Sequence, residues 1–115
     1  MPTISSHVLN SENGTHVSDL TITLSHLKED GKKEVIFSSK TDKGGRLSES
    51  FTVDLSKDKI FELEFKISDL FPKKEAGIYC NDLIFRISLN SREEKFHIPV
   101  IISRHGASTW WSGAQ

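Results

Sequence analysis

Apolar residues occupy every second position in several stretches of the chain, of which 20–24 and 61–67 are the clearest. A spacing of two is that of a β-strand burying one face, and these stretches do not follow the helical spacing of 3.6. Turn signals rich in Gly, Asn and Asp separate them. The pattern predicts an all-β chain with strands over 4–10, 19–27, 33–39, 50–54, 59–67, 80–89, 94–103 and 107–111.

One segment, Ser68 to Ala76, favours a short helix instead. Ser68 or Asp69 can cap its first turn, and Gly77 can end it. Eight short strands with one helix predict a two-sheet antiparallel sandwich. The chain shows no internal repeat, low-complexity stretch or linker, so we expect a single domain over residues 1–115.

The composition is that of an ordinary globular protein, with 27% charged and 36% hydrophobic residues and a formal net charge of -1. The basic pairs Lys32-Lys33 and Lys73-Lys74 are short and flanked by acids, without the aromatic residues that stack on bases. No apolar run approaches the roughly 20 residues that span a bilayer. We therefore expect neither a nucleic-acid nor a membrane partner.

Cys80 is the only cysteine, so no intrachain disulfide can form. The first residues lack the basic and apolar regions of a secretory signal. Both features favour a reducing compartment and a cytoplasmic protein, with a mature periplasmic chain as the open alternative.

Two of the five histidines, His7 and His97, lie within predicted strands and alternate with apolar neighbours. Each therefore projects to the face opposite its neighbours, and the two can share one face. The ordinary role of such a residue is structural, as a half-exposed strand residue or a satisfied core histidine. The remaining three are expected at the surface and lack paired metal-ligand spacing, so no metal or cofactor is predicted: His16, His26 and His105.

Covalent catalysis has no visible basis in the sequence. There is no Gly-Xaa-Ser-Xaa-Gly elbow, and Cys80 has no histidine near it in sequence. The segment Lys43-Gly44-Gly45-Arg46 lacks the spacing of a phosphate-binding loop. We interpret it as a turn that presents one arginine.

Taken together, three segments resemble the transthyretin-like 5-hydroxyisourate hydrolases, in the same order and at closely matching spacing. The similarity covers nearly the whole chain. The segments are Ser6–Asn10 followed by Asn13-Gly14, then Thr41–Leu47, and finally Phe96–Ser103.

The resemblance implies a sandwich of two antiparallel sheets, assembled as a homotetramer with active sites at the dimer–dimer interface. It also implies that His7, Arg46 and His97 occupy catalytic positions. Their chemistry suits hydrolysis, because one imidazole can take a proton from water while the other orients it or protonates the departing nitrogen. A guanidinium can hold a urate-like ring and its developing oxyanion.

The C-terminal tail departs from the family pattern, which ends in Tyr-Arg-Gly-Ser. Here Trp110 and Trp111 replace the tyrosine and arginine. A tryptophan can stack on a flat purine-derived substrate, and Ser112 supplies a hydroxyl if the tail shifts by one residue. The alternative is that both tryptophans pack a subunit interface.

The resemblance therefore implies hydrolysis of 5-hydroxyisourate to 2-oxo-4-hydroxy-4-carboxy-5-ureidoimidazoline in urate degradation. The alternative is a transthyretin-like tetrameric binding protein without hydrolase activity. The histidine pair favours catalysis, and two bulky tryptophans would obstruct an open channel. A third hypothesis is a subunit with a degraded site that serves only assembly.

Overall fold

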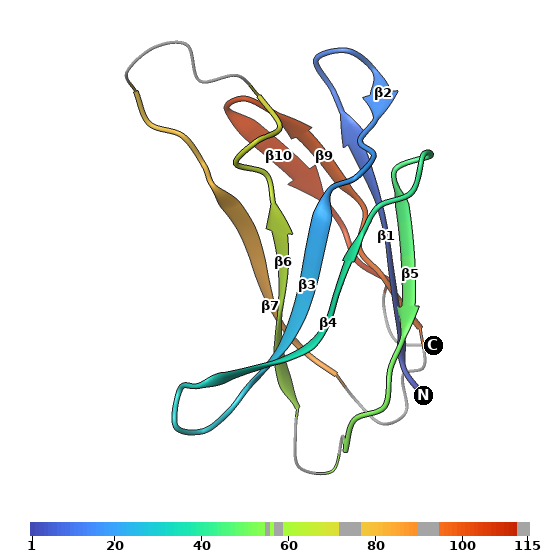
Figure 1. Ribbon diagram of the computed structural model, residues 1–115, viewed down its shortest axis with the longest axis vertical. Coiled ribbons are helices and arrows are strands. Elements are labelled where there is room, and N and C mark those ends of the chain that lie inside the picture. The colour runs from blue at the N-terminus through green and yellow to red at the C-terminus, as the bar shows by residue number, and fades with distance from the viewer. Residues whose placement is uncertain (55, 57–58, 72–76, 90–94, 113–115) are drawn as a thin grey trace.

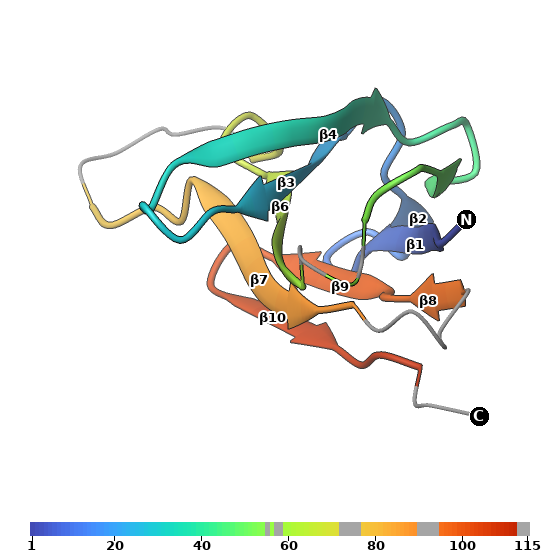
Figure 2. The same cartoon turned by 90° about the horizontal axis from the view of Figure 1, so that it is seen from below.

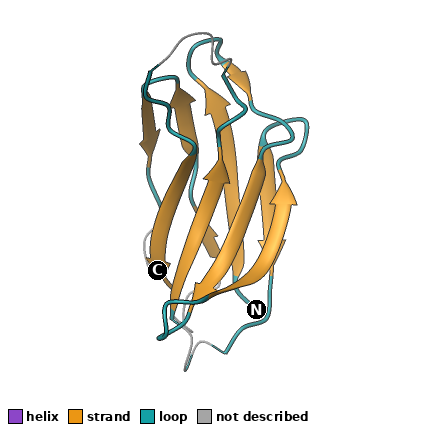
Figure 3. Cartoon of the chain, turned by 60° about the vertical axis from the view of Figure 1, so that its left-hand side comes forward, coloured by secondary structure: helices purple, strands orange, loops and turns teal. Residues whose placement is uncertain are grey.

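The computed structural model describes residues 1–54, 56, 59–71, 77–89 and 95–112, and within these ranges every regular element is a strand (Figures 1 and 3). The strands are β1 (Thr3–Asn10), β2 (Thr15–His16), β3 (Thr21–Leu27), β4 (Lys33–Lys40), β5 (Arg46–Ser50), β6 (Ile60–Lys66), β7 (Asp82–Ser88), β8 (Lys95–His97), β9 (Val100–Ser103) and β10 (Gly106–Thr109). None of the described residues forms a helix long and apolar enough to cross a membrane.

Two sheets form the layers of a sandwich (Figure 2). One is antiparallel, in the order β4-β3-β6-β7. The other is built around β1, which pairs antiparallel with β2 and β5 and parallel with β8 and β9, while β10 pairs with β9. The expected all-β sandwich is confirmed, and its sheets are mostly antiparallel.

The core lies between the two sheets, where the alternating apolar residues point inward. Leu24 and Leu63 lie opposite each other on β3 and β6 and are fully buried. From the other sheet, Ile4, Val8 and Val100 are also fully buried. The period of two in the stretches 20–24 and 61–67 therefore predicted which faces of β3 and β6 pack.

Most of the predicted strands end within two residues of the observed ones, but two of them do not match. The strand expected over 50–54 lies at 46–50 as β5, immediately after the glycine turn. The strand expected over 94–103 is interrupted after His97, because Pro99 has no N–H to donate and the Ile98 carbonyl accepts a hydrogen bond from the Ser6 hydroxyl at 2.6 Å. The two-residue strand β2 was not expected from the sequence.

The helix predicted over Ser68 to Ala76 is not seen. Residues 68–70 form a turn closed by one hydrogen bond, from the Leu70 N–H to the Ile67 carbonyl. Phe71 precedes a proline, which disfavours a helical backbone at that residue. The rest of the prediction, residues 72–76, lies outside the described residues.

Candidate functional site

The outer face of β1 carries the candidate site. Its inward residues Ile4, Ser6 and Val8 are buried, so Ser5 and His7 project outward. Two neighbouring strands then place further side chains on this face. Arg46 of β5 lies opposite His7 on one side of β1, and His97 of β8 lies opposite Ser5 on the other. The sequence-predicted trio is therefore gathered on one face by three strands.

His7 is held by two groups through the same ring nitrogen. Its Nε2 lies 3.0 Å from the Gly44 carbonyl oxygen and 3.0 Å from Nδ1 of His16. The rings of His7 and His16 also stack, with centroids 5.1 Å apart. Partial burial lowers the pKa of His7, and the positive charge of Arg46 lowers it further. These effects favour the neutral imidazole, which is the form that can act as a base.

The turn before β5 is tightly fixed. The Asp42 carboxylate accepts hydrogen bonds from the backbone N–H groups of Gly44 and Arg46, both at 2.9 Å. The Arg46 N–H is the main cause of the lowered pKa of Asp42. Gly45 has a φ of 75°, and a Cβ there would lie 2.6 Å from the Val8 carbonyl oxygen. Only glycine therefore lets this turn approach β1 closely enough for the Gly44 carbonyl to reach His7.

Replacing Gly45 by alanine is expected to lower the free energy of unfolding by about 2 kcal/mol or more, since strain at positive φ adds to the backbone clash. Gly31→Ala is the matched control, because Gly31 also has positive φ but no atom near its added Cβ. Its expected cost is about 1 kcal/mol. Urea unfolding followed by far-ultraviolet circular dichroism measures both, and equal losses would contradict this account of the turn.

His97 is anchored by side-chain and backbone contacts. Its Nδ1 lies 2.9 Å from the Ser5 hydroxyl oxygen. Its backbone N–H donates to the Ser112 hydroxyl, and its carbonyl accepts from the Ser112 N–H, both at 3.0 Å. No described residue hydrogen-bonds to Nε2 of His97, which leaves that nitrogen for a ligand.

The two tail tryptophans lie in different surroundings. The Trp110 ring makes an edge contact with His97, at 5.6 Å between centroids. Trp111 instead lines a cavity of about 450 Å³ with Phe96 and Ile98, which flank His97 in sequence and therefore project to the opposite face. Trp110 is 57% exposed and Trp111 is 69% exposed, so both rings remain largely open to solvent. Of the two, Trp110 is the one beside the histidines.

Sequence reasoning assigned three contributors to other roles or missed them: Ser5, His16 and Gly44. His16 lies at the surface as expected, but its direct contact with His7 was not predicted. The turn around Asn13-Gly14 is the sequence feature that could have indicated this contact, because it returns the chain antiparallel to β1. The expectation for His26 was wrong, because this residue is buried against Phe61. Within the described ranges no three His, Cys, Asp or Glu side chains form a metal-binding group.

Comparison with known proteins adds independent information. Residues 4–112 match the HIUase/Transthyretin family. A 5-hydroxyisourate hydrolase from Halalkalibacterium halodurans is 23% identical over 112 residues, covering 93% of this chain and 94% of that protein.

Solved structures show the same fold at lower identity. Sea bream transthyretin in complex with thyroxine superposes with a TM-score of 0.78 at 12% identity, covering 96% of this chain and 95% of that one. An (S)-allantoin synthase superposes with a TM-score of 0.77 at 18% identity, covering 97% of this chain and 44% of that one.

Proposed function

Because the chain belongs to the HIUase/transthyretin family, we propose that it hydrolyses 5-hydroxyisourate to 2-oxo-4-hydroxy-4-carboxy-5-ureidoimidazoline during urate degradation in the cytoplasm. The observation that carries the proposal is the gathering of His7, Arg46 and His97 on one outer face. The similarity to a 5-hydroxyisourate hydrolase supports the same substrate.

The proposed division of roles follows from the surroundings of each group. His7, whose pKa is lowered, takes a proton from the attacking water. His97 donates a proton from Nε2 to the departing ring nitrogen. The guanidinium of Arg46, on the other side of His7, binds the carbonyl oxygen as negative charge develops there. His97 must carry an extra proton to act as the acid, so the charge on the histidine pair is unchanged when His7 gains a proton and His97 loses one. A proton then passes from His7 to His97 through solvent before the next turnover.

The C-terminal tail supplies the remaining residues that we propose to bind the substrate. Trp110 offers an aromatic face beside His97, and Ser112 holds the backbone of His97 in place. Trp111, the other tryptophan proposed to bind substrate, lines the cavity on the Phe96 side, so its contact with a substrate held at His97 would be the weaker of the two. This arrangement replaces the polar groups of the family's usual Tyr-Arg-Gly-Ser ending with aromatic contact area.

We also infer a homotetramer in which a neighbouring subunit covers the His7 face at a dimer–dimer interface. Leu9 continues that face along β1, and Ile101 opposite it is 43% exposed, which leaves apolar area beside the site. Sedimentation equilibrium at micromolar concentration should give about four times the chain mass of 13.0 kDa. A monomer alone would contradict the assembly.

The alternative function, a carrier without hydrolase activity, can be distinguished from the hydrolase by the ligand that the protein binds. Urate is a flat, unreactive relative of the proposed substrate, whereas thyroxine is the ligand in the sea bream transthyretin complex. Urate should shift the imidazole NMR signals of His7 and His97. In the His97→Ala variant, the shift of the His7 signal should be smaller. Binding of thyroxine without any effect of urate would favour the carrier and contradict the proposed substrate class.

A further inference from the structure

We propose that His16 is a positioning residue for His7, accepting a hydrogen bond from its ring and holding that ring in one orientation and one tautomer. The kinetic part of this inference rests on the proposed hydrolysis, whereas the hydrogen bond itself does not. His16 does not touch the substrate in this role. It acts through His7, as the third member of an acid–base relay orients the base.

The direction of the hydrogen bond follows from the Gly44 carbonyl. A carbonyl oxygen can only accept, so at 3.0 Å it requires a proton on Nε2 of His7. The neighbouring Nδ1 of His16, also at 3.0 Å from that nitrogen, must then present its lone pair. His16 therefore carries its own proton on Nε2, and both rings are fixed as Nε2–H tautomers in their neutral forms.

This assignment leaves Nδ1 of His7 as the basic nitrogen. No described residue hydrogen-bonds to that atom, so it is the nitrogen that can take a proton from water. When it does, the positive ring donates from Nε2 to two acceptors at once, the Gly44 carbonyl and His16 Nδ1. A charge-assisted bond is stronger than a neutral one, so a neutral His16 stabilises His7 most when His7 is protonated, whereas a positive charge on His16 lowers the pKa of His7.

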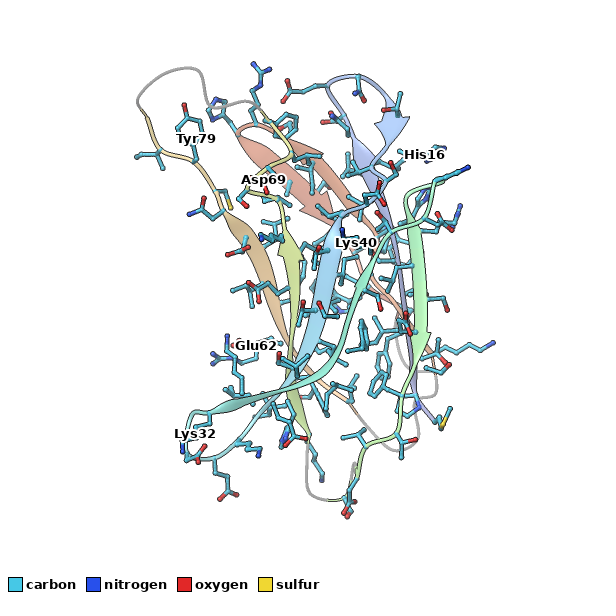
Figure 4. All side chains as sticks on the ribbon, in the orientation of Figure 1. His16, Lys32, Lys40, Glu62, Asp69 and Tyr79 are labelled. Atoms are coloured by element: carbon cyan, nitrogen blue, oxygen red, sulfur yellow. The ribbon has the colours of Figure 1, made fainter. Side chains whose placement is uncertain are left out.

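The fold holds His16 in place for this contact. His16 lies opposite Leu9 in the β1–β2 pair, so His7, two residues back on the same face, is its diagonal neighbour. Gly45 packs so close to His16 that a Cβ at position 45 would lie only 3.1 Å from Cβ of His16. Figure 4 shows His16 beside the turn that leads into β5. Backbone pairing and the close packing of the glycine turn therefore place the backbone and Cβ of His16 beside His7.

Two substitutions separate the hydrogen bond from the ring contact. His16→Phe keeps a flat ring but removes the acceptor, while His16→Asn keeps a polar acceptor near the position of Nδ1. The matched controls are His105→Phe and His105→Asn, since His105 is exposed in the turn between β9 and β10. Phenylalanine at position 16 should lower kcat roughly 10-fold with little change in KM, the effect of one hydrogen bond. Asparagine should restore most of that loss.

A readout that does not depend on activity is the nitrogen-15 NMR spectrum of the histidine rings above neutral pH. His16 should appear as the Nε2–H tautomer, and its Nδ1 signal should move when His7 is replaced by phenylalanine. A spectrum with the proton on Nδ1 of His16, or no response to His7→Phe, would overturn the positioning role.

The two proposals fail in different ways. If the parent protein does not hydrolyse the substrate, the proposed function fails, and the NMR spectrum alone still decides whether His16 holds His7. If the parent is active, equal kcat in the parent and His16→Phe proteins would overturn the inference. Equal impairment of the phenylalanine and asparagine variants would also overturn it, because restoring the acceptor should restore the rate.

Discussion

Replacement of His97 by alanine should lower kcat for 5-hydroxyisourate by roughly 10²–10⁴-fold, the usual contribution of a positioned acid or base. The fold should remain, because the two hydrogen bonds that tie residue 97 to Ser112 use the backbone of residue 97. The lost side chain contacts only Ser5 and Trp110 among the described residues that hydrogen-bond to it or stack on it.

The measurement is steady-state hydrolysis, with urea unfolding on the same samples. His105→Ala serves as the control, since it removes an exposed imidazole from the turn at 104–105. His7→Ala should show a loss of similar size. If both His7→Ala and His97→Ala retain near-parental rates, the residue assignment is wrong even for an active hydrolase.

Replacement of Trp110 by alanine should lower kcat/KM by roughly 5- to 150-fold. Stacking of a base on an aromatic ring is worth about 1–3 kcal/mol by alanine substitution, and a urate-like ring is comparably flat. At about 1.4 kcal/mol per factor of ten, that range gives the expected loss. Trp110→Tyr should keep much of the activity, because it retains an aromatic face and restores the family's residue at this position.

Trp111→Ala is the comparison variant. Trp111 is more exposed than its neighbour and lines the cavity on the Phe96 side, so its loss should cost less than that of Trp110. Steady-state kinetics and sedimentation on both variants separate recognition from assembly. Unaltered kinetics in both alanine variants, with only a weaker tetramer, would assign the tryptophans to interface packing.

The strands could be predicted because burial of one sheet face imposes a period of two. Stretches such as 20–24 and 61–67 have no other efficient way to bury alternate apolar side chains. The errors occurred where backbone chemistry overrides this pattern. Pro99 interrupts a long apolar run, and the residues after Ile67 form a single turn where capping residues predicted a helix. Such features depend on hydrogen bonds, which periodicity does not report.

The site divides in the same way. Alternation alone placed His7 and His97 on outward faces, and the resemblance added Arg46. Neither the alternation nor the resemblance could identify His16 or the Gly44 carbonyl, because their contact with His7 depends on how closely the glycine turn packs against β1. The hydrogen bond between His7 and His16 depends on how β2 pairs with β1. A strand of two residues is too short to show a periodic pattern in the sequence.

The most direct measurement is the decay of 5-hydroxyisourate itself. The compound can be generated from urate with uricase, and its absorbance followed after addition of the purified protein, with the His7→Ala, His97→Ala double variant as the matched control. The account predicts that the parent protein accelerates the decay in proportion to its concentration and that the double variant does not. A decay no faster with the parent protein than without it would contradict the proposed hydrolysis.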